Sequence, residues 1–386
     1  EINFGEMDVG GIHKFIQYYH WSIKMLKKIK LFDPVVGIKE EKAIKNVLNS
    51  GFWASGSGIG NVEKFEKEFQ NFTKSKECIA VNSGTAALHL ALSLYDIKNK
   101  EVILPSLSFV STAHAIIYNG GKPIFADVNE SDLCLDTNDV ERKISKKTAA
   151  IIPVHFGGMP ANISKLEKIA NKKNIPIIED AAHACGAQWN KKRIGSHSQV
   201  VCFSFHPVKN LAMPTGGLIS INSNNHKLLK KKLVESRWCG ITNRKKLDYD
   251  IKNIGWNFYM NEFSAAIGRI QLGKLDVMNK KRREIATRYH KEIQNEKMDI
   301  SKNSVYHFYW ILVKNRKKFQ EEMNKMNIET GTHYKPIHKM SMYKKKIKMP
   351  VTDKIANEII TLPTHPNLTE ENISRIINCV NKFSDR

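Results

Sequence analysis

The chain has 386 residues, of which 41% are hydrophobic and 26% charged, a balance typical of a soluble globular protein. Its net charge of +23 would suit a nucleic-acid partner, but the basic residues are scattered and no nucleic-acid-binding motif accompanies them, so we expect no such partner. The six cysteines form no Cys-x-x-Cys pair, which indicates reduced thiols in a cytoplasmic protein rather than disulfides or a metal site. No apolar run approaches the length of a membrane span.

The chain up to residue 73 is predicted to be mainly helical. Residues 12–32 are typical of a basic amphipathic helix, which we expect to pack on this protein or on a partner subunit, with a membrane surface as the alternative. A helix is expected over residues 38–50, where Gly51 ends it, and another over residues 61–73. The stretch 53–58 between them is predicted to be a loop.

From residue 77 onward, short apolar runs alternate with helical stretches. The expected strands cover residues 78–81, 102–104, 123–127, 149–154, 176–179, 200–205 and 218–221, with helices over residues 85–94, 111–118 and 163–173, among others. Near-continuous apolar strands that alternate with helices indicate a mostly parallel sheet covered on both faces. A long helix over about 262–294 then leads to a final region that we expect to be a smaller α+β domain.

Four short motifs follow predicted strands at their carboxyl ends, where ligands of parallel sheets collect. In the first, Ser83-Gly84-Thr85 precedes an alanine- and leucine-rich helix. The free N–H groups at such a helix start suit a phosphate, although a plain N-cap gives the same pattern. In the second, Phe109 follows a strand and suits stacking on a flat ring, with a core phenylalanine as the alternative.

The third motif ends a strand on Asp180, and the fourth, CFSFHPVKNLAMPTGG (202–217), contains Lys209. A buried carboxylate at Asp180 needs a cation or donors, which a pyridinium N–H would supply, while an N-cap is the alternative. Partial burial would lower the pKa of Lys209 and free its amine for a Schiff base, although a lone lysine is ordinarily a surface residue. Ser204 precedes Lys209 by five residues and can face the same ligand.

Together the four motifs supply what one cofactor needs. They offer a cup for a phosphate, an aromatic for a ring, a carboxylate for a ring nitrogen and a lysine for a Schiff base. That cofactor is pyridoxal phosphate.

Several stretches also resemble a known family, among them VNSGTAALHLAL (81–92), IPIIEDAAHACGA (175–187), CFSFHPVKN (202–210) and GWNFYMNEFSAAIGRIQL (255–272). From about residue 36 to residue 380, the chain resembles the sugar aminotransferases of the DegT/DnrJ/StrS group, pyridoxal-phosphate enzymes of the aspartate-aminotransferase fold. This resemblance implies a three-layer α/β/α large domain with a mostly parallel seven-stranded sheet, plus a smaller C-terminal α+β domain. We accordingly expect an N-terminal extension over 1–35, a cofactor-binding domain over 36–270 and a small domain over 271–386.

The site residues of the family are assigned here by position. Lys209 matches the lysine that holds the cofactor and moves the proton, and Asp180 matches the aspartate on the pyridine nitrogen. His183 matches the residue beside the phenolic oxygen of the cofactor. The resemblance assigns the remaining contacts as follows: ring stacking to Phe109, the phosphate to Gly84, Thr85 and Ser204, and the neighbouring subunit's phosphate to Asn257.

The reaction that this resemblance implies is ping-pong transamination through a lysine aldimine, in a homodimer with two shared active sites. L-glutamate is the expected amino donor, and a nucleotide-linked 4-keto-6-deoxy sugar is the expected acceptor, because FSFHPVK resembles enzymes that aminate C4. Amination at C3 stays open. A sugar dehydratase of the same family is disfavoured because those relatives replace the lysine with histidine. A non-catalytic basic binding or regulatory protein on the same scaffold is a further alternative.

The chain departs from the pattern of many relatives at three places. Met213-Pro214-Thr215 stands before the glycine pair where many have Thr-Gly-Glu. Tyr259 stands where many have arginine, and Cys239 where many have histidine. These changes leave the identity of the sugar undecided, but not the cofactor chemistry.

Overall fold

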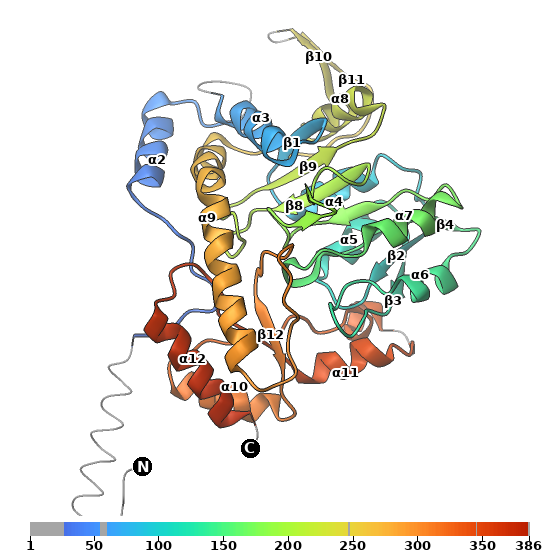
Figure 1. Ribbon diagram of the computed structural model, residues 1–386. Coiled ribbons are helices and arrows are strands. Elements are labelled where there is room, and N and C mark those ends of the chain that lie inside the picture. The colour runs from blue at the N-terminus through green and yellow to red at the C-terminus, as the bar shows by residue number, and fades with distance from the viewer. Residues whose placement is uncertain (1–26, 55–59, 246–247, 345, 385–386) are drawn as a thin grey trace, which may run out of the picture.

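The computed structural model describes residues 27–54, 60–245, 248–344 and 346–384 (Figure 1). A central sheet lies between layers of helices, and the last part of the chain gathers at one end of the molecule. Residues 12–26, most of the predicted basic helix, lie outside the described residues. In the part that the structure describes, no helix is both long and apolar enough to cross a membrane.

The central sheet has seven strands in the spatial order β3, β2, β4, β5, β8, β9, β1. Their bounds are Lys122–Ala126, Glu101–Pro105, Thr148–Ile151, Ile178–Asp180, Val200–Ser204, Gly217–Ile221 and Glu77–Val81 in that order. β3, β2 and β4 pair in parallel, as do β5 and β8, and parallel bridges at Ile151–Ile177 and Val154–Asp180 join the two groups. β9 is antiparallel to both β8 and β1, so the sheet is mostly parallel, as predicted.

Alternate residues of the strands supply a hydrophobic core on each face of the sheet. In β1, Ile79 and Val81 pack into one core, whereas Cys78 and Ala80 pack into the other, as the two-residue period of a strand requires. The first core is covered by α4 (Gly84–Leu92), α5 (Ser111–Tyr118) and α8 (His226–Ser236). The opposite face is covered by α3 (Asn61–Thr73), α6 (Thr137–Lys143), α7 (Ile163–Asn171) and α9 (Glu262–Glu292). This arrangement confirms the predicted three layers.

The helices predicted from residue 38 onward are confirmed, with small differences at their ends. Residues 27–32, the end of the predicted basic helix, are not helical, because Ile29 forms a parallel bridge with Ile328 instead. α2 (Ile38–Ser50), α3 and α5 have the predicted bounds, and Gly51 ends α2 in the left-handed conformation at φ 68°. α4, α7 and α9 each end two residues before the predicted position. The predicted strands 149–154 and 176–179 are shorter, because Pro153 and Pro176 have no N–H to donate and regular pairing stops beside them.

After α9 the chain forms a mixed region of helices and strands. β12 (Tyr309–Leu312) and β13 (Ile359–Leu362) pair antiparallel, and they share a core with α10 (Arg316–Lys325), α11 (Pro350–Glu358) and α12 (Glu370–Phe383). The remaining short elements are η2 (Phe156–Gly158), η3 (Ile337–Lys339), η4 (Ser341–Tyr343) and two hairpins, β6 (Gln188–Trp189) with β7 (Lys192–Arg193) and β10 (Ile241–Lys245) with β11 (Asp248–Ile251). The domain bounds stay a prediction, and the boundary at residue 270 falls inside α9.

Residues 27–35, called the strap below, join this C-terminal region instead of the central sheet. Ile29 N–H donates to the carbonyl of Asn327 at 2.8 Å, and the Ile29 carbonyl accepts from Glu329 N–H at 2.9 Å. The strap therefore pairs with the segment that follows α10, and it brings Phe32 to the large cavity described below.

Asp127, the residue after β3, caps α11 although more than 220 residues separate them in the sequence. The local N-cap residue, Met349, provides no side-chain cap. Asp127 Oδ1 accepts from Thr352 N–H at 2.8 Å, and Oδ2 accepts from Val351 N–H at 3.1 Å. Because the carboxylate is buried, we expect Asp127→Ala to lower the free energy of unfolding by about 1–3 kcal/mol, measured by urea-induced unfolding.

Asp96→Ala is the matched control for this variant. Asp96 is an exposed aspartate that pairs with Lys100, so its removal is expected to leave the unfolding midpoint unchanged. Equal midpoints for the two variants would show that Asp127 does not hold α11.

Candidate active site

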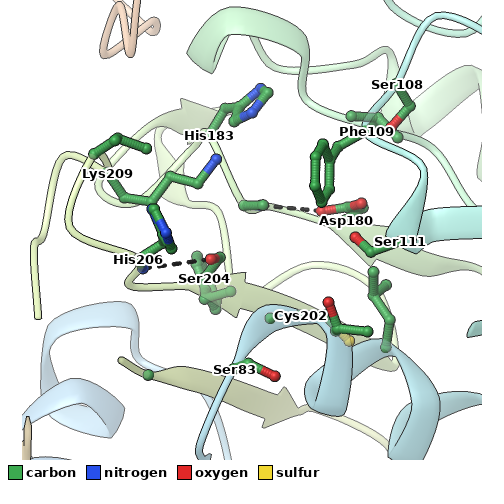
Figure 2. Close-up of a pocket in the computed structure, with 18 of the residues that line it drawn as sticks. Ser83, Ser108, Phe109, Ser111, Asp180, His183, Cys202, Ser204, His206 and Lys209 are labelled. Atoms are coloured by element: carbon green, nitrogen blue, oxygen red, sulfur yellow. Dashed lines mark hydrogen bonds between the residues drawn. The ribbon is translucent and has the colours of Figure 1, made fainter. Parts of the chain in front are cut away.

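A cavity of about 360 Å³ lies where the parallel strands of the central sheet end (Figure 2). Its wall includes seven of the eight residues predicted to bind the cofactor: Gly84, Thr85, Phe109, Asp180, His183, Ser204 and Lys209. They come from the start of α4, from the residues just before α5, and from the ends of β5 and β8 with the loops that follow those strands. The structure thus brings together residues that are up to 125 positions apart in the sequence.

The start of α4 forms one end of the cavity. Ser83 caps the helix, because its Oγ accepts from Ala86 N–H at 3.1 Å. Gly84 follows, packed closely against Ser204 at the end of β8, where a Cβ atom on Gly84 would lie 2.6 Å from the Ser204 Cβ. Gly84 therefore lets the helix start lie directly against Ser204. The free N–H groups of the helix start and the Ser204 hydroxyl line the same end of the cavity, which suits an anionic group such as a phosphate.

Gly84→Ala is expected to disturb this end of the cavity. The added methyl group would force α4 and β8 apart, so we expect a loss of about 1–3 kcal/mol in the free energy of unfolding and a cofactor affinity at least about 10-fold lower. The first is measured by urea-induced unfolding, and the second by titrating the cofactor-free protein with pyridoxal phosphate.

Gly273→Ala provides the opposite control. Gly273 lies within α9, and no atom lies within 4 Å of the position its Cβ would take. Alanine there is expected to raise the free energy of unfolding by about 0.5–1 kcal/mol and to leave cofactor affinity unchanged. Unchanged cofactor binding in Gly84→Ala would contradict a phosphate position beside Gly84.

Asp180 is the last residue of β5 and is 4% exposed. One carboxylate oxygen accepts from Thr112 Oγ1 at 2.8 Å, and the other accepts from Ala182 N–H at 3.1 Å. Burial raises the pKa of Asp180 above its ordinary value, although these donors and the charge of Lys209 act in the opposite direction. Asp180 is thus a carboxylate whose charge a further cationic N–H would stabilise.

Lys209 lies in the loop after β8, and its side chain points into the cavity (Figure 2). The loop turns back on itself, because Lys209 N–H donates to the carbonyl of His206 at 2.8 Å. Burial lowers the pKa of the Lys209 amine to about 8, although Asp180 acts in the opposite direction. About a tenth of this amine is therefore unprotonated at pH 7 and about half at pH 8, far more than for an ordinary lysine, as a nucleophilic lysine requires.

His183 is buried between two hydrogen-bond partners. Gly157 N–H donates to its Nδ1 at 3.4 Å, and its Nε2 lies 3.0 Å from the Tyr334 hydroxyl oxygen. Burial holds the pKa of His183 well below the ordinary value, so the ring is neutral. Since Nδ1 accepts, we assign the proton to Nε2, which then donates to Tyr334.

Phe109 and Asn257 occupy different places relative to the cavity. Phe109 lies at the edge of the cavity, where its side chain is 56% exposed. Its ring centroid lies 6.0 Å from that of Tyr334. Asn257 does not line the cavity; its carbonyl accepts from the Asn82 amide at 3.2 Å. The structure therefore brings seven of the predicted residues together and leaves Asn257 outside.

The sequence analysis missed Thr112, Tyr334, His333 and Phe32. Thr112 bonds to Asp180 and lies three residues after Phe109, so the motif that contains Phe109 already pointed to this region. His333, Tyr334 and Phe32 line the cavity from the C-terminal region and from the strap. No local pattern marked these three residues. Among the described residues, no cluster of His, Cys, Asp or Glu suits a metal ion.

The fold is that of sugar aminotransferases. The structure of the sugar aminotransferase CalS13 from Micromonospora echinospora matches with a TM-score of 0.85 and 27% identity, covering 92% of this chain and 99% of that one. The chain belongs to the DegT/DnrJ/EryC1/StrS aminotransferase family, whose model matches residues 35–381. The predicted family, fold and enzyme class, a sugar aminotransferase, are therefore confirmed.

Two curated relatives are named as nucleotide-sugar enzymes. The chain is 35% identical to the dTDP-3-amino-3,6-dideoxy-alpha-D-galactopyranose transaminase of Aneurinibacillus thermoaerophilus, over 89% of this chain and 94% of that protein. It is 32% identical to the GDP-perosamine synthase of Escherichia coli O157:H7, over 93% of this chain and 99% of that protein.

Proposed function

We propose that this protein uses pyridoxal phosphate to transfer an amino group from L-glutamate to a nucleotide-linked keto sugar. One observation supports this proposal above all others. Lys209, Asp180 and the start of α4 line one cavity, although they lie at or after the ends of three different strands, β8, β5 and β1.

The residues present fit pyridoxal phosphate. The N–H groups at the start of α4 and the Ser204 hydroxyl line the same end of the cavity, which suits the phosphate, and the close contact between Gly84 and Ser204 leaves no room for a side chain at position 84. Asp180 is buried with two donors but has a raised pKa, so a protonated ring nitrogen would stabilise its charge. Lys209 would hold the cofactor through its amine, and Phe109 offers an aromatic face at the cavity edge.

The chemistry divides between the cofactor and the chain. Pyridoxal phosphate, when bound, supplies an electron-accepting ring and holds the amino group between the two half-reactions. Lys209 moves the proton, because its amine, with a pKa of about 8, both accepts and returns a proton near neutral pH. Asp180 supplies a fixed negative charge in a buried setting. His183 is neutral and acts through hydrogen bonds.

The proposed acceptor is a sugar linked to a nucleoside diphosphate. The names of two relatives, a GDP-sugar and a dTDP-sugar enzyme, support this class. The net charge of +23 also favours an acceptor that bears a negatively charged diphosphate.

Two ring carbons of the sugar are candidates for amination. The lysine motif FSFHPVK favours C4 by its resemblance to C4-aminating enzymes. The name of the relative with 35% identity contains 3-amino, which favours C3. We propose C4 first and keep C3 as the second candidate.

We further propose that two copies of the chain form a dimer in which each completes the active site of the other. Among the described residues that line the cavity, Lys209 is accompanied by no arginine, although the cofactor phosphate and the donor carboxylates both need cations. Asn257 lies outside the cavity of its own subunit. Phe52 and Trp53 are 53% and 50% exposed in the single chain, as expected for apolar side chains that a second subunit covers.

Mixed dimers test this arrangement. A dimer made only of Lys209→Ala subunits, or only of Asn257→Ala subunits, is expected to have lowered turnover. When they are co-expressed, one site of each mixed dimer has both native residues, so about a quarter of all sites become native. Recovery of about a quarter of wild-type turnover is expected. No recovery, despite mixed dimers detected by mass spectrometry, would place Asn257 in its own site or in none.

Mass spectrometry with isotopically labelled substrate tests the proposed function. The cofactor-loaded protein is incubated with L-glutamate labelled with ¹⁵N, first without an acceptor and then with 4-keto-6-deoxy or 3-keto-6-deoxy sugars linked to dTDP or GDP. We expect one equivalent of 2-oxoglutarate per subunit in the first step and ¹⁵N in the sugar in the second. No 2-oxoglutarate would exclude glutamate as donor, and no amination from any donor would favour the non-catalytic alternative.

A further inference from the structure

A stack of aromatic rings runs from the strap to the predicted catalytic histidine. Phe32 lies on His307, with centroids 5.2 Å apart and planes at 16°, and His307 lies on His183 at 4.6 Å and 27°. His183 in turn hydrogen bonds to Tyr334. His307 is therefore the ring between the strap and His183.

His307 is also linked to His183 through the backbone of Gly157. His307 N–H donates to the Gly157 carbonyl at 2.9 Å, while Gly157 N–H donates to His183 Nδ1. The same residue thus fixes one face of the His183 ring and the donor that determines its tautomer. A substitution at His307 would remove the stacked imidazole but keep the backbone bond to Gly157.

The imidazole of His307 is bound to the residue that follows Lys209. His307 Nδ1 lies 3.2 Å from Asn210 Oδ1. The Asn210 amide nitrogen donates to Asn279 Oδ1 and to the carbonyl of Val305, each at 2.9 Å, so its oxygen is the acceptor. We therefore assign the His307 proton to Nδ1. His307 is 1% exposed, so neither bond competes with bulk water.

We propose that His307 is a positioning residue of the transamination, which holds the ring of His183 and the loop of Lys209 in one fixed arrangement. This inference rests on the proposed function above. His307 does not line the cavity, so it acts through its neighbours rather than on a substrate. Burial keeps its pKa well below the ordinary value, and a neutral ring can stack and donate without repelling Lys209.

Two variants separate the stack from the hydrogen bond. His307→Phe keeps a flat ring but leaves the buried Asn210 oxygen without its donor, which favours outward movement of the loop. His307→Asn keeps an N–H near the position of Nδ1 but removes the ring from the stack. His365→Phe is the matched control, because His365 is another buried histidine that contacts the strap without lining the cavity.

The first measurement follows the protonation of the Lys209 amine and does not depend on turnover. The cofactor-free full chain is treated with formaldehyde and dimethylamine borane over a pH series, and methylation of the Lys209 peptide is quantified. Wild type is expected to show a midpoint near pH 8. His307→Phe is expected to raise this midpoint by about one pH unit, because a more hydrated amine holds its proton longer. His307→Asn and His365→Phe are expected to leave it unchanged.

The second measurement separates kcat from KM for L-glutamate. Both His307 variants are expected to lower kcat about 10-fold with a change in KM below about 3-fold, because they misplace groups without removing a substrate contact. His365→Phe is expected to lower only the melting temperature. An unchanged midpoint in His307→Phe together with unchanged kcat would overturn the proposal.

The outcomes remain distinguishable if a variant or the proposed function fails. If His307→Phe does not fold, His307→Asn decides, since a lowered kcat at an unchanged midpoint supports the proposal and an unchanged kcat overturns it. If the wild-type protein releases no oxo acid from any amino donor, the proposed function fails, and the positioning role in transamination fails with it. The methylation midpoint then still shows whether His307 holds the Lys209 loop.

Discussion

Replacing Lys209 by alanine is expected to lower steady-state turnover by a factor of about 10³ or more. Lys209 would both hold the cofactor and move the proton, and general acid–base groups alone contribute about 10²–10⁴-fold. An ordinary lysine, with a pKa near 10.4, has well under about 1% of its amine unprotonated at pH 8. Lys209, with a pKa of about 8, has roughly half, so a lysine with the ordinary pKa does not match it. Turnover with ¹⁵N-labelled glutamate measures the effect.

Lys317→Ala is the control for this change. Lys317 is an exposed lysine of α10, away from the cavity, and its loss is expected to leave turnover unchanged. Comparable turnover in the Lys209→Ala protein and in wild type would show that the lysine of this loop has no part in the reaction.

Asp180→Asn is expected to have two opposite effects. Turnover should fall by about 10²-fold or more, because asparagine supplies no negative charge to a protonated ring nitrogen. The cofactor-free protein should become more stable near neutral pH. Burial raises the pKa of Asp180, so its ionisation opposes folding at every pH above the ordinary carboxyl range. Asparagine removes this cost and keeps the size of the side chain.

The stability effect has a defined pH dependence. The folded protein holds the Asp180 proton to a higher pH than the unfolded chain, so the carboxyl destabilises progressively as the pH rises from the ordinary carboxyl pKa through the raised one. The difference in melting temperature between the cofactor-free variant and wild type should therefore be small in acid and largest near neutral pH. Asp276→Asn, at an exposed position, should show no such trend. A less stable Asp180→Asn at neutral pH would contradict this expectation.

The sequence was most informative where one physical pattern dominates a segment. Apolar runs such as 78–81 and 218–221 have to be buried on both faces, and this requirement alone predicts a covered sheet. Gly51 marked the end of α2 because a glycine adopts the left-handed conformation at little cost. The apolar run 149–154 predicted a longer strand than β4, which ends at Ile151. Pro153 has no backbone N–H to donate to a neighbouring strand, so regular pairing does not continue.

The candidate site was predictable where its residues follow strands directly. Asp180 ends one apolar strand and Lys209 lies five residues after the end of another, and the sheet brings those ends together. Tyr334 and Phe32 approach the cavity from the C-terminal region and the strap, and Tyr334 meets a partner 151 positions away. Such contacts depend on how separate cores pack, which short sequence patterns do not encode.

Borohydride reduction of the cofactor-loaded protein, followed by peptide mapping, tests most directly whether Lys209 holds the cofactor. Reduction makes the bond between pyridoxal phosphate and its lysine permanent, so mass spectrometry identifies the modified residue. The expected result is one phosphopyridoxyl group per subunit, on the peptide that contains Lys209. A group on another lysine, or none after pyridoxal phosphate has been supplied in excess, would contradict the proposed function.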